Sequence, residues 1–551
     1  MASYTVRVGG TGNKLASVDG DPTDASACMP LATALGESYS AGDVLLFADT
    51  GGDYYAILNT PSAGEAGTYF YQQAYPGHSP VFNGSDVTTG WEAHATLPLV
   101  WQKTGITYEP SMIWFDDVRG TKKDNAASLT TQMDWCWVSD VAYVYSATDP
   151  DAAYTAVELA ARRYCLLSTA KPYVITDGLE FKHSDWLSAY CVSGSHHNKF
   201  LNCHAHDSMV GFKLVTTADD CTFDSCTSEY HTGDGFAVSG TSDVLVYRMT
   251  ITNCISRENM YIDGINGGSG TGIKAFGLKD SLVTKSIWND NDQGGIRFDG
   301  GGTIGEASYW GCEYNTVSEN ILFENGGVGG IDGDPSQVDQ IMMEFSDHND
   351  VKFNVVYDCV DGGYNIGLSR AGSCNVLGNI TWGASGTSVG SIRTYFSAGG
   401  EGRENYIVGN IVDQSWWGLS LNGSGYEIIR NNIFSRSASG SDMRFANAED
   451  ALTVDSNYNC FAGGGSGAVT VLGVGHMNLA EWQTYSSQDA NSITDDPLFT
   501  DPSSRDYTLQ VGSPCIDSGD KSLGSPFNEA LHPSSDITTA GGMIIVDRDD
   551  H

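Results

Sequence analysis

The stretch that decides the fold runs from His231 to Gly301. It reads HTGDGFAVSG at residues 231–240, TITNCISRENMYIDGINGGSGTGIKAFG at 250–277 and SIWNDNDQGGIRFDGG at 286–301. Each segment places a glycine directly before a short strand-like run: Gly235-Phe236, Gly272-Ile273 and Gly295-Ile296. Because glycine and asparagine favour turns while short apolar runs favour strands, this recurrence predicts one structural unit repeated along the chain.

A polar residue followed by an apolar residue marks an equivalent turn far beyond this stretch. The pairs are Asn202-Cys203, Ser225-Cys226, Asn253-Cys254, Ser286-Ile287, Asn320-Ile321, Asn354-Val355, Asn379-Ile380, Asn410-Ile411 and Asn432-Ile433. They recur at intervals of about 22 to 34 residues, which suits a coil of three short strands with insertions at the turns. The sequence therefore predicts an all-β chain, a right-handed parallel β-helix whose equivalent positions stack about 4.8 Å apart.

The same alignment predicts two columns of stacked side chains. The Asn and Ser residues would hydrogen-bond along their own column, and the apolar residues that follow them would fill the interior. Cys203, Cys226 and Cys254 fall in the column that Ile and Val occupy in later coils. We therefore expect these cysteines to be buried free thiols that act as small apolar residues.

The chain divides into three parts by pattern. Residues 1–110 are expected to form an N-terminal cap and the first coils, with a short helix near Met29–Leu35 that covers the first coil. Residues 111–460 are expected to form the β-helix, with the site near residues 200–300, although residues 111–164 follow no pattern that assigns them. Residues 461–551 are expected to form a closing segment.

The bulk composition narrows the partners. A formal net charge of −40 with only 28 Lys and Arg residues disfavours nucleic acid, whose phosphates need clustered cations. No apolar run of about 18 residues is present, so we expect no membrane span. The N-terminus lacks a secretory signal pattern, which leaves either a secreted protein whose signal precedes residue 1 or a phage virion tail. Secreted monomers and phage-type trimers both fit, so the oligomeric state stays open.

Cations recur at one outward position of the predicted coils. If Phe212, Phe236, Ile273, Ile296, Ile331 and Ile392 point inward, alternation turns the next residue of each strand outward. Those residues are Lys213, Ala237, Lys274, Arg297, Asp332 and Arg393. Such a strip favours an extended anionic ligand, an acidic polysaccharide, with Lys213, Asp332 and Arg393 as substrate contacts. The alternative is that outward strand residues are simply often charged.

Uronic-acid polymers can be cleaved by β-elimination, in which a base removes the proton next to the carboxylate and the glycosidic oxygen leaves. The developing negative charge needs a metal ion, Arg or Lys nearby. A lysine acts as the base only if its pKa falls towards the working pH, which a neighbouring cation favours. Lys274 as base and Arg297 as charge stabiliser or acid have the required chemistry.

The run from Asp234-Gly235-Phe236 to Gly270-Thr271-Gly272-Ile273-Lys274 resembles polysaccharide lyase family nine, the calcium-dependent pectate lyases that use a lysine base. The resemblance covers roughly residues 200–300. It implies that Lys274 is the base and that Asp234 binds the catalytic Ca²⁺, with Asp207 and Asp263 as further ligands. This chain departs from the family pattern because Gly233, Ala237 and Val238 surround Asp234. If calcium is absent, Arg297 would neutralise the substrate carboxylate, as in alginate-type β-helix lyases with a Lys and an Arg.

Two other classes of function remain. Paired aspartates from the set Asp290, Asp292, Asp299, Asp332 and Asp334 would suit a β-helix glycoside hydrolase or a phage tailspike depolymerase. A non-catalytic glycan-binding rod is the third class. His204 and His206 would face the same way on a strand, a spacing compatible with a metal, but we interpret them as surface or turn residues.

Overall fold

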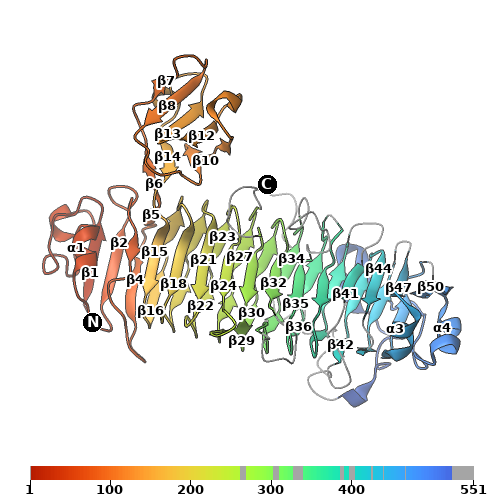
Figure 1. Cartoon of the computed structure of the whole chain (residues 1–551). Helices are drawn as coiled ribbons and strands as arrows, with labels where there is room; N and C mark the ends of the chain where they lie inside the picture. The colour runs from red at the N-terminus through yellow and green to blue at the C-terminus, as the bar shows by residue number, and fades with distance from the viewer. Residues whose placement is uncertain are drawn as a thin grey trace. The chain divides into compact units, whose positions relative to one another are not determined.

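The computed structural model describes residues 2–260, 269–301, 310–326, 339–360, 362–384, 390–395, 404–423, 426–437, 440–465 and 467–523. They form two compact units: residues 2–237 with Met260, and residues 238–259 with the described residues from Ser269 onward. Short strands wind into long parallel sheets, with few helices (Figure 1), so the predicted right-handed parallel β-helix is confirmed. The domain boundaries predicted near residues 110 and 460 stay predictions.

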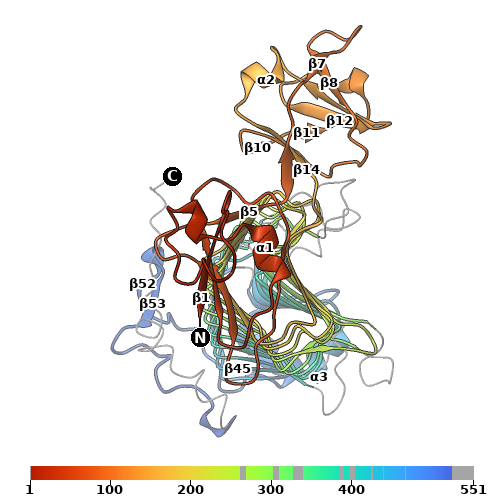
Figure 2. The ribbon, with the colours of Figure 1, turned by 90° about the vertical axis from the view of Figure 1, so that its left-hand side faces the viewer.

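The first unit carries three parallel sheets. Their strands, in hydrogen-bonded order, are β1 (Ser3–Arg7), β2 (Val44–Ala48), β4 (Phe70–Ala74), β16 (Val174–Asp177), β19 (Lys199–Leu201) and β22 (Thr222–Asp224); β3 (Leu58–Asn59), β15 (Tyr164–Thr169), β18 (Leu187–Val192) and β21 (Val210–Val215); and β5 (Val81–Asn83), β17 (Glu180–Lys182), β20 (His204–His206) and β23 (Thr227–Glu229). The short helix α1 (Leu31–Gly36) packs against β1 at the end of the first coil (Figure 2), close to where the sequence predicts a helix.

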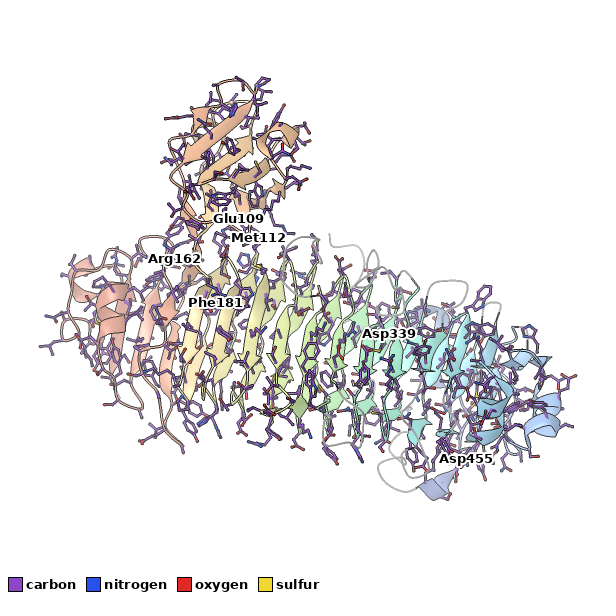
Figure 3. The ribbon with its side chains drawn as sticks, in the orientation of Figure 1. Glu109, Met112, Arg162, Phe181, Asp339 and Asp455 are labelled. Atoms are coloured by element: carbon purple, nitrogen blue, oxygen red, sulfur yellow. The ribbon has the colours of Figure 1, made fainter. Side chains whose placement is uncertain are left out.

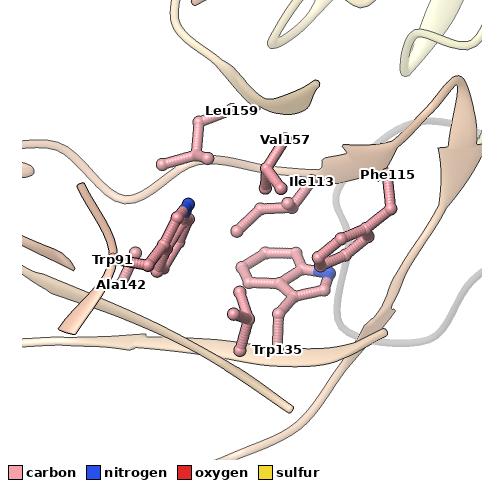
Figure 4. Close-up of a cluster of buried hydrophobic side chains, with 8 residues drawn as sticks. Trp91, Ile113, Phe115, Trp135, Ala142, Val157 and Leu159 are labelled. Atoms are coloured by element: carbon pink, nitrogen blue, oxygen red, sulfur yellow. The ribbon is translucent and has the colours of Figure 1, made fainter. Parts of the chain in front are cut away.

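Two small, mainly antiparallel sheets interrupt the coils of this unit. We call residues 85–160 the inserted module. Its sheets are β10 (Val118–Arg119), β9 (Ile113–Phe115), β14 (Val157–Ala160) and β6 (Ser85–Val87); and β11 (Thr121–Lys122), β12 (Asp134–Val138), β13 (Val141–Tyr145), β8 (Val100–Thr104) and β7 (Glu92–Ala93), with α2 (Pro150–Ala153) before β14. The sheets share an apolar core around Trp91, Phe115 and Trp135 (Figure 4). The module contains most of the residues that the sequence pattern leaves unassigned.

The second unit repeats the three-sheet pattern. Its strands in order are β26 (Thr250–Thr252), β30 (Leu282–Thr284), β33 (Thr316–Ser318), β36 (Asp350–Lys352), β39 (Asn375–Leu377), β42 (Asn405–Val408), β45 (Glu427–Arg430) and β48 (Asp455–Asn457); β28 (Ile273–Phe276), β32 (Ile296–Asp299), β35 (Ile341–Glu344), β38 (Ile366–Ser369), β41 (Gly390–Tyr395), β44 (Trp417–Asn422), β47 (Ser441–Phe445), β50 (Gly467–Val471) and β51 (Gly475–Met477); and β27 (Ile255–Arg257), β31 (Ile287–Asn289), β34 (Ile321–Phe323), β37 (Val355–Tyr357), β40 (Ile380–Trp382), β43 (Ile411–Asp413), β46 (Ile433–Ser435) and β49 (Cys460–Ala462).

Other strands and helices accompany these sheets. They are β24 (Phe236–Ser239), within which the two units meet in sequence; the pair β25 (Val246–Tyr247) and β29 (Leu278–Lys279); α3 (Ala448–Thr453); α4 (Leu479–Ser486); and the pair β52 (Phe499–Asp501) and β53 (Asp506–Leu509). Helix α4 packs against β50 and β51 at the end of the second unit's coils. Among the described residues, no helix is long and apolar enough to span a membrane.

Buried asparagines form a hydrogen-bonded ladder along the second unit. Asn354 Nδ2 donates to Asn379 Oδ1 at 3.0 Å, and Asn379 Nδ2 donates to Asn410 Oδ1 at 3.0 Å. Equivalent bonds join Asn320 to Asn354, Asn410 to Asn432 and Asn432 to Asn459. Each oxygen also accepts the backbone N–H of the preceding asparagine, as Asn379 Oδ1 does from Asn354. The ladder thus satisfies buried backbone groups at one turn of every coil, as predicted for this column.

The predicted place of the cysteines in this alignment is wrong by one residue. Strand register pairs Ile255 with Ile287, and the backbone N–H of Cys254 donates to Ser286 Oγ, which belongs to the asparagine column. The cysteines therefore stand where later coils place asparagine, while Ile287 is only half-buried on the outer side. A shift of one residue exchanges the two faces of a strand, which explains the error. Cys203, Cys226 and Cys254 are nevertheless buried and free, as predicted.

Candidate functional site

The outer face of the sheet that runs from β28 to β47 carries the candidate site. Register pairs Lys274 of β28 with Arg297 of β32, and their neighbours Ile273 and Ile296 are fully buried on the inner side. Alternation therefore turns Lys274 and Arg297 to the same outer face. The same row, which we call the outer row, continues across the sheet through Met342, Gly367, Arg393, Ser420 and Arg444.

Arg297 does not reach solvent as an exposed cation. It is 5% exposed, and its Nη2 lies 2.6 Å from Glu344 Oε2 and 3.6 Å from Asp299 Oδ2. Each carboxylate lies two residues after the outer row on its own strand, β32 or β35, and so faces the same side of the sheet. One guanidinium thus holds two carboxylates on the same face of the sheet.

Arg393 is likewise buried, at 6% exposure. Its Nε and Nη2 both lie 2.9 Å from Asp339 Oδ2, and Asp339 (labelled in Figure 3) is itself 1% exposed. The predicted strip of solvent-facing cations is therefore wrong at Arg297 and Arg393. The physical reason is that a buried charge needs an opposite charge, and a residue from another coil supplies one in each case.

Lys274 is the more accessible cation of the pair. Its side chain is half-buried, and its Nζ lies 5.2 Å from the ring centroid of Phe276 on the same strand. Phe276 in turn pairs in register with Asp299 of β32. The lysine amine and the Asp299 carboxyl therefore share one small region of the outer face.

Burial favours the protonated form of Asp299 within this group. Burial raises the pKa of Asp299 above its ordinary value; the charges of Arg297 and Lys274 oppose the rise and Glu344 adds to it. Burial also raises the pKa of Asp339, against the opposing charge of Arg393. On β47, burial raises the pKa of Asp442 to about 7. A raised pKa favours the protonated form of a carboxyl group, which is the form that can donate a proton.

The other residues predicted for the site lie in the first unit or outside the described residues. Lys213 on β21 is half-buried with its Nζ 6.0 Å from the ring of Trp186; burial lowers its pKa, while the charge of Asp234 opposes this. Asp332 and Asp263 lie outside the described residues. The roles predicted for these residues stay predictions.

A calcium site requires six to eight oxygen ligands. Asp207 Oδ2 lies 3.0 Å from His206 Nδ1. Within the described part of the chain, the groups of three or more potential ligands are Glu180, His204 and His206, and Asp117, Glu158 and His183. Neither contains Asp207 or Asp234, and both contain histidine nitrogens in place of oxygen. The third predicted ligand, Asp263, lies outside the described residues, so the calcium requirement stays a prediction.

Sequence reasoning missed Glu344 and Asp339, and it named Asp299 only as a possible hydrolase carboxylate. Glu344 was within reach of the alternation argument, because it stands two residues beyond Met342 of the outer row. The alternation argument could not have identified Asp339, because this residue precedes β35 and no strand pattern fixes where its side chain points. Asp290, also considered for hydrolysis, is an exposed turn residue with φ 53°.

Comparison with protein-family models and with curated proteins finds no match. Among solved structures, the chain is similar to a glycoside hydrolase, with 10% identity over 89% of this chain and 99% of that chain and a TM-score of 0.48. It is also similar to XylC in complex with xylose, with 11% identity over 90% and 87% of the two chains and a TM-score of 0.45. Pectate lyase Pel9A follows with 11% identity, 95% and 92% coverage and a TM-score of 0.40.

Proposed function

We propose that the chain cleaves a uronic-acid-containing polysaccharide by β-elimination on this outer face, outside the cell or as part of a virion tail. The observation that supports this most directly is the register of Lys274 with Arg297 beside Asp299. The amine and the carboxyl group lie on one face of the sheet, which supports roles as proton acceptor and proton donor.

The elimination divides between Lys274 and Asp299. The neutral amine of Lys274 takes the proton from the carbon next to the substrate carboxylate. The electron pair of that C–H bond forms a carbon–carbon double bond, and the bond from the neighbouring carbon to the glycosidic oxygen breaks. Asp299 donates its proton to the departing oxygen, which its raised pKa permits. Atoms and charges balance without a metal or a co-reactant.

Arg297 acts in this proposal as a positioning residue. Because it is buried and bound to Glu344 and Asp299, it fixes both carboxylates. This differs from direct contact with the substrate, which the sequence alone suggested for an arginine at this place.

The test is an assay of the full chain on pectate and alginate, with near-ultraviolet absorbance reporting the unsaturated product. Lys274→Arg keeps the positive charge but cannot accept a proton near neutral pH, so we expect kcat to fall by about 10²–10⁴-fold. Asp299→Asn should lower kcat by a similar factor. Lys285→Ala removes a half-exposed lysine that lies 3.8 Å from Glu319 at a turn of the same unit, and should leave activity unchanged. Full activity of Lys274→Arg would contradict the lysine role.

A glycoside hydrolase is the second candidate, favoured by the environments of Asp299 and Glu344. Asp299 has a raised pKa, whereas Glu344 forms an ion pair with Arg297, and hydrolases use one protonated and one ionised carboxyl group. Hydrolysis would release reducing ends without near-ultraviolet absorbance, and Glu344→Gln would abolish it while Lys274→Arg would not. A glycan-binding rod would give neither product.

A further inference from the structure

His183 lies in the first unit, directly after β17, at the contact between the coils and the inserted module. Its side chain is fully buried, and its ring stacks on Trp114 of β9 with centroids 4.0 Å apart. A small apolar cluster fills this contact and consists of Met112, Trp114, Ala160 and Met209. Figure 3 labels Met112 and Arg162 in this region. A buried imidazole at a junction requires partners for both ring nitrogens.

Only one of the two ring nitrogens has a hydrogen-bond partner. Nδ1 lies 2.8 Å from Glu158 Oε2, and the other oxygen of Glu158 accepts from the Tyr55 hydroxyl at 3.0 Å and from Asn83 Nδ2 at 3.1 Å. Nε2 of His183 makes no hydrogen bond. Because the carboxylate of Glu158 accepts the proton of Nδ1, the lone pair of the imidazole lies on Nε2.

Another acceptor lies near this lone pair. Asp117 Oδ1, on the turn between β9 and β10, lies 3.7 Å from His183 Nε2. The His183 side of this contact is buried, and two acceptors that face each other repel unless a proton or another cation lies between them. Asp117 also lies 2.8 Å from Lys182 Nζ, and Asp53 lies 3.6 Å from the same nitrogen. Two carboxylates thus share one ammonium group here, which leaves an excess of negative charge.

We propose that His183 Nε2 and Asp117 bind a divalent transition-metal ion, for which Zn²⁺ is the best chemical match. Zinc binds imidazole nitrogen and carboxylate oxygen at about 2.0–2.2 Å, which sets two such ligands about 3.3 Å apart at a tetrahedral angle. The observed 3.7 Å is close to that separation. Ligands that include an imidazole suit zinc and disfavour Ca²⁺.

Glu158 acts as the positioning residue of this site. Histidines that bind metal usually donate their second ring N–H to a carboxylate, which fixes the ring and strengthens the ligand. Glu158 belongs to β14 of the module, Asp117 to the turn after β9, and His183 to the coils. The ion would therefore join the module to the coils, whatever reaction the outer face of the second unit performs.

The experiment is calorimetric titration of the full chain with ZnCl₂ in a buffer that does not bind zinc. We expect saturable binding that weakens by at least about 10-fold in Asp117→Asn. Asp117 has a side chain that is 68% exposed, so this variant should fold. The matched control Asp140→Asn changes an exposed aspartate at the turn between β12 and β13, and should bind zinc as the unmodified chain does. His183→Gln should lose binding as well, and Asp117→Asn decides the question if that variant does not fold.

Two outcomes would overturn the proposal. One is the absence of zinc binding to the full chain. The other is binding that persists in Asp117→Asn and is lost in His204→Gln, which would place the ion at the group of Glu180, His204 and His206.

Discussion

Asp442 shows how a single buried carboxyl group on the outer face couples folding to pH. It is 1% exposed, its Oδ1 accepts from Ser437 Oγ at 2.5 Å, and its Oδ2 accepts from the backbone N–H of Gly463 at 3.3 Å. Burial raises its pKa to about 7, against these two hydrogen bonds. In the unfolded chain its pKa returns to the ordinary value of about 3.9.

The folded state therefore binds one more proton than the unfolded state between about pH 4 and pH 7. Stability from this group is highest below pH 4, falls as pH rises to 7, and is constant above 7. We expect Asp442→Asn to remove this loss. The free energy of unfolding of the variant, relative to that of the unmodified chain, should therefore rise by roughly 2–4 kcal/mol from pH 5 to pH 8. Urea unfolding of both proteins at the two pH values measures the difference. An equal difference at both values would show that Asp442 titrates normally.

For Lys274 and Arg297, the sequence predicts which side of the sheet they face but not which residues contact them. Alternation along a strand decides which side of the sheet a residue faces. Glu344 comes from the coil after Arg297, and Asp339, which precedes β35, comes from two coils before Arg393 on β41. Spacing along the chain does not predict such contacts. The sequence therefore predicts solvent-facing cations where the structure has ion pairs.

Among the elements, the asparagine ladder offers the sharpest test of what holds the coils together. Asn379 is fully buried; its Nδ2 donates to Val351 O at 2.9 Å and to Asn410 Oδ1 at 3.0 Å. Its Oδ1 accepts from both the backbone N–H and Nδ2 of Asn354, so Asn379→Ala would leave a buried backbone donor unsatisfied. We expect destabilisation of roughly 1–3 kcal/mol, measured by chemical unfolding.

The control for this variant lies four residues earlier. Asn375 on β39 is only half-buried, and its side chain bonds Asp350 at 2.7 Å. Asn375→Ala should change stability by about 0.5 kcal/mol or less. Equal losses in the two variants would argue against the ladder as a special source of stability.

The elements also show which part of the fold the sequence predicts. Recurrence of Asn before an apolar residue predicts the coils, because every coil must satisfy the same buried turn. The cysteine coils break that recurrence, and a small thiol and an amide look unlike in sequence although they share a position. The inserted module escapes prediction because its antiparallel strands occur once and repeat nothing.

For the whole molecule, the net charge of −40 governs the approach of a polyanionic substrate. Because Arg297 and Arg393 are ion-paired, long-range repulsion by the acidic chain should dominate the encounter. Raising NaCl from about 20 to about 200 mM shortens the screening distance and should lower KM for a polyuronate. Initial rates at several salt concentrations test this. A KM that rises with salt would instead indicate an attractive cationic groove.

The asparagine ladder also has a direction, since every amide oxygen points back along the chain and every amide NH₂ group points forward. Stacked dipoles of this kind add, so the column has a weak net dipole whose forward end is positive. At that end Asn459 Nδ2 donates to Asp489 Oδ1 at 3.1 Å, and Asp489 also accepts from Trp482 of α4 at 2.9 Å. The segment after α4 thus closes the coils electrostatically as well as sterically, with a carboxylate at the positive pole of the amide stack.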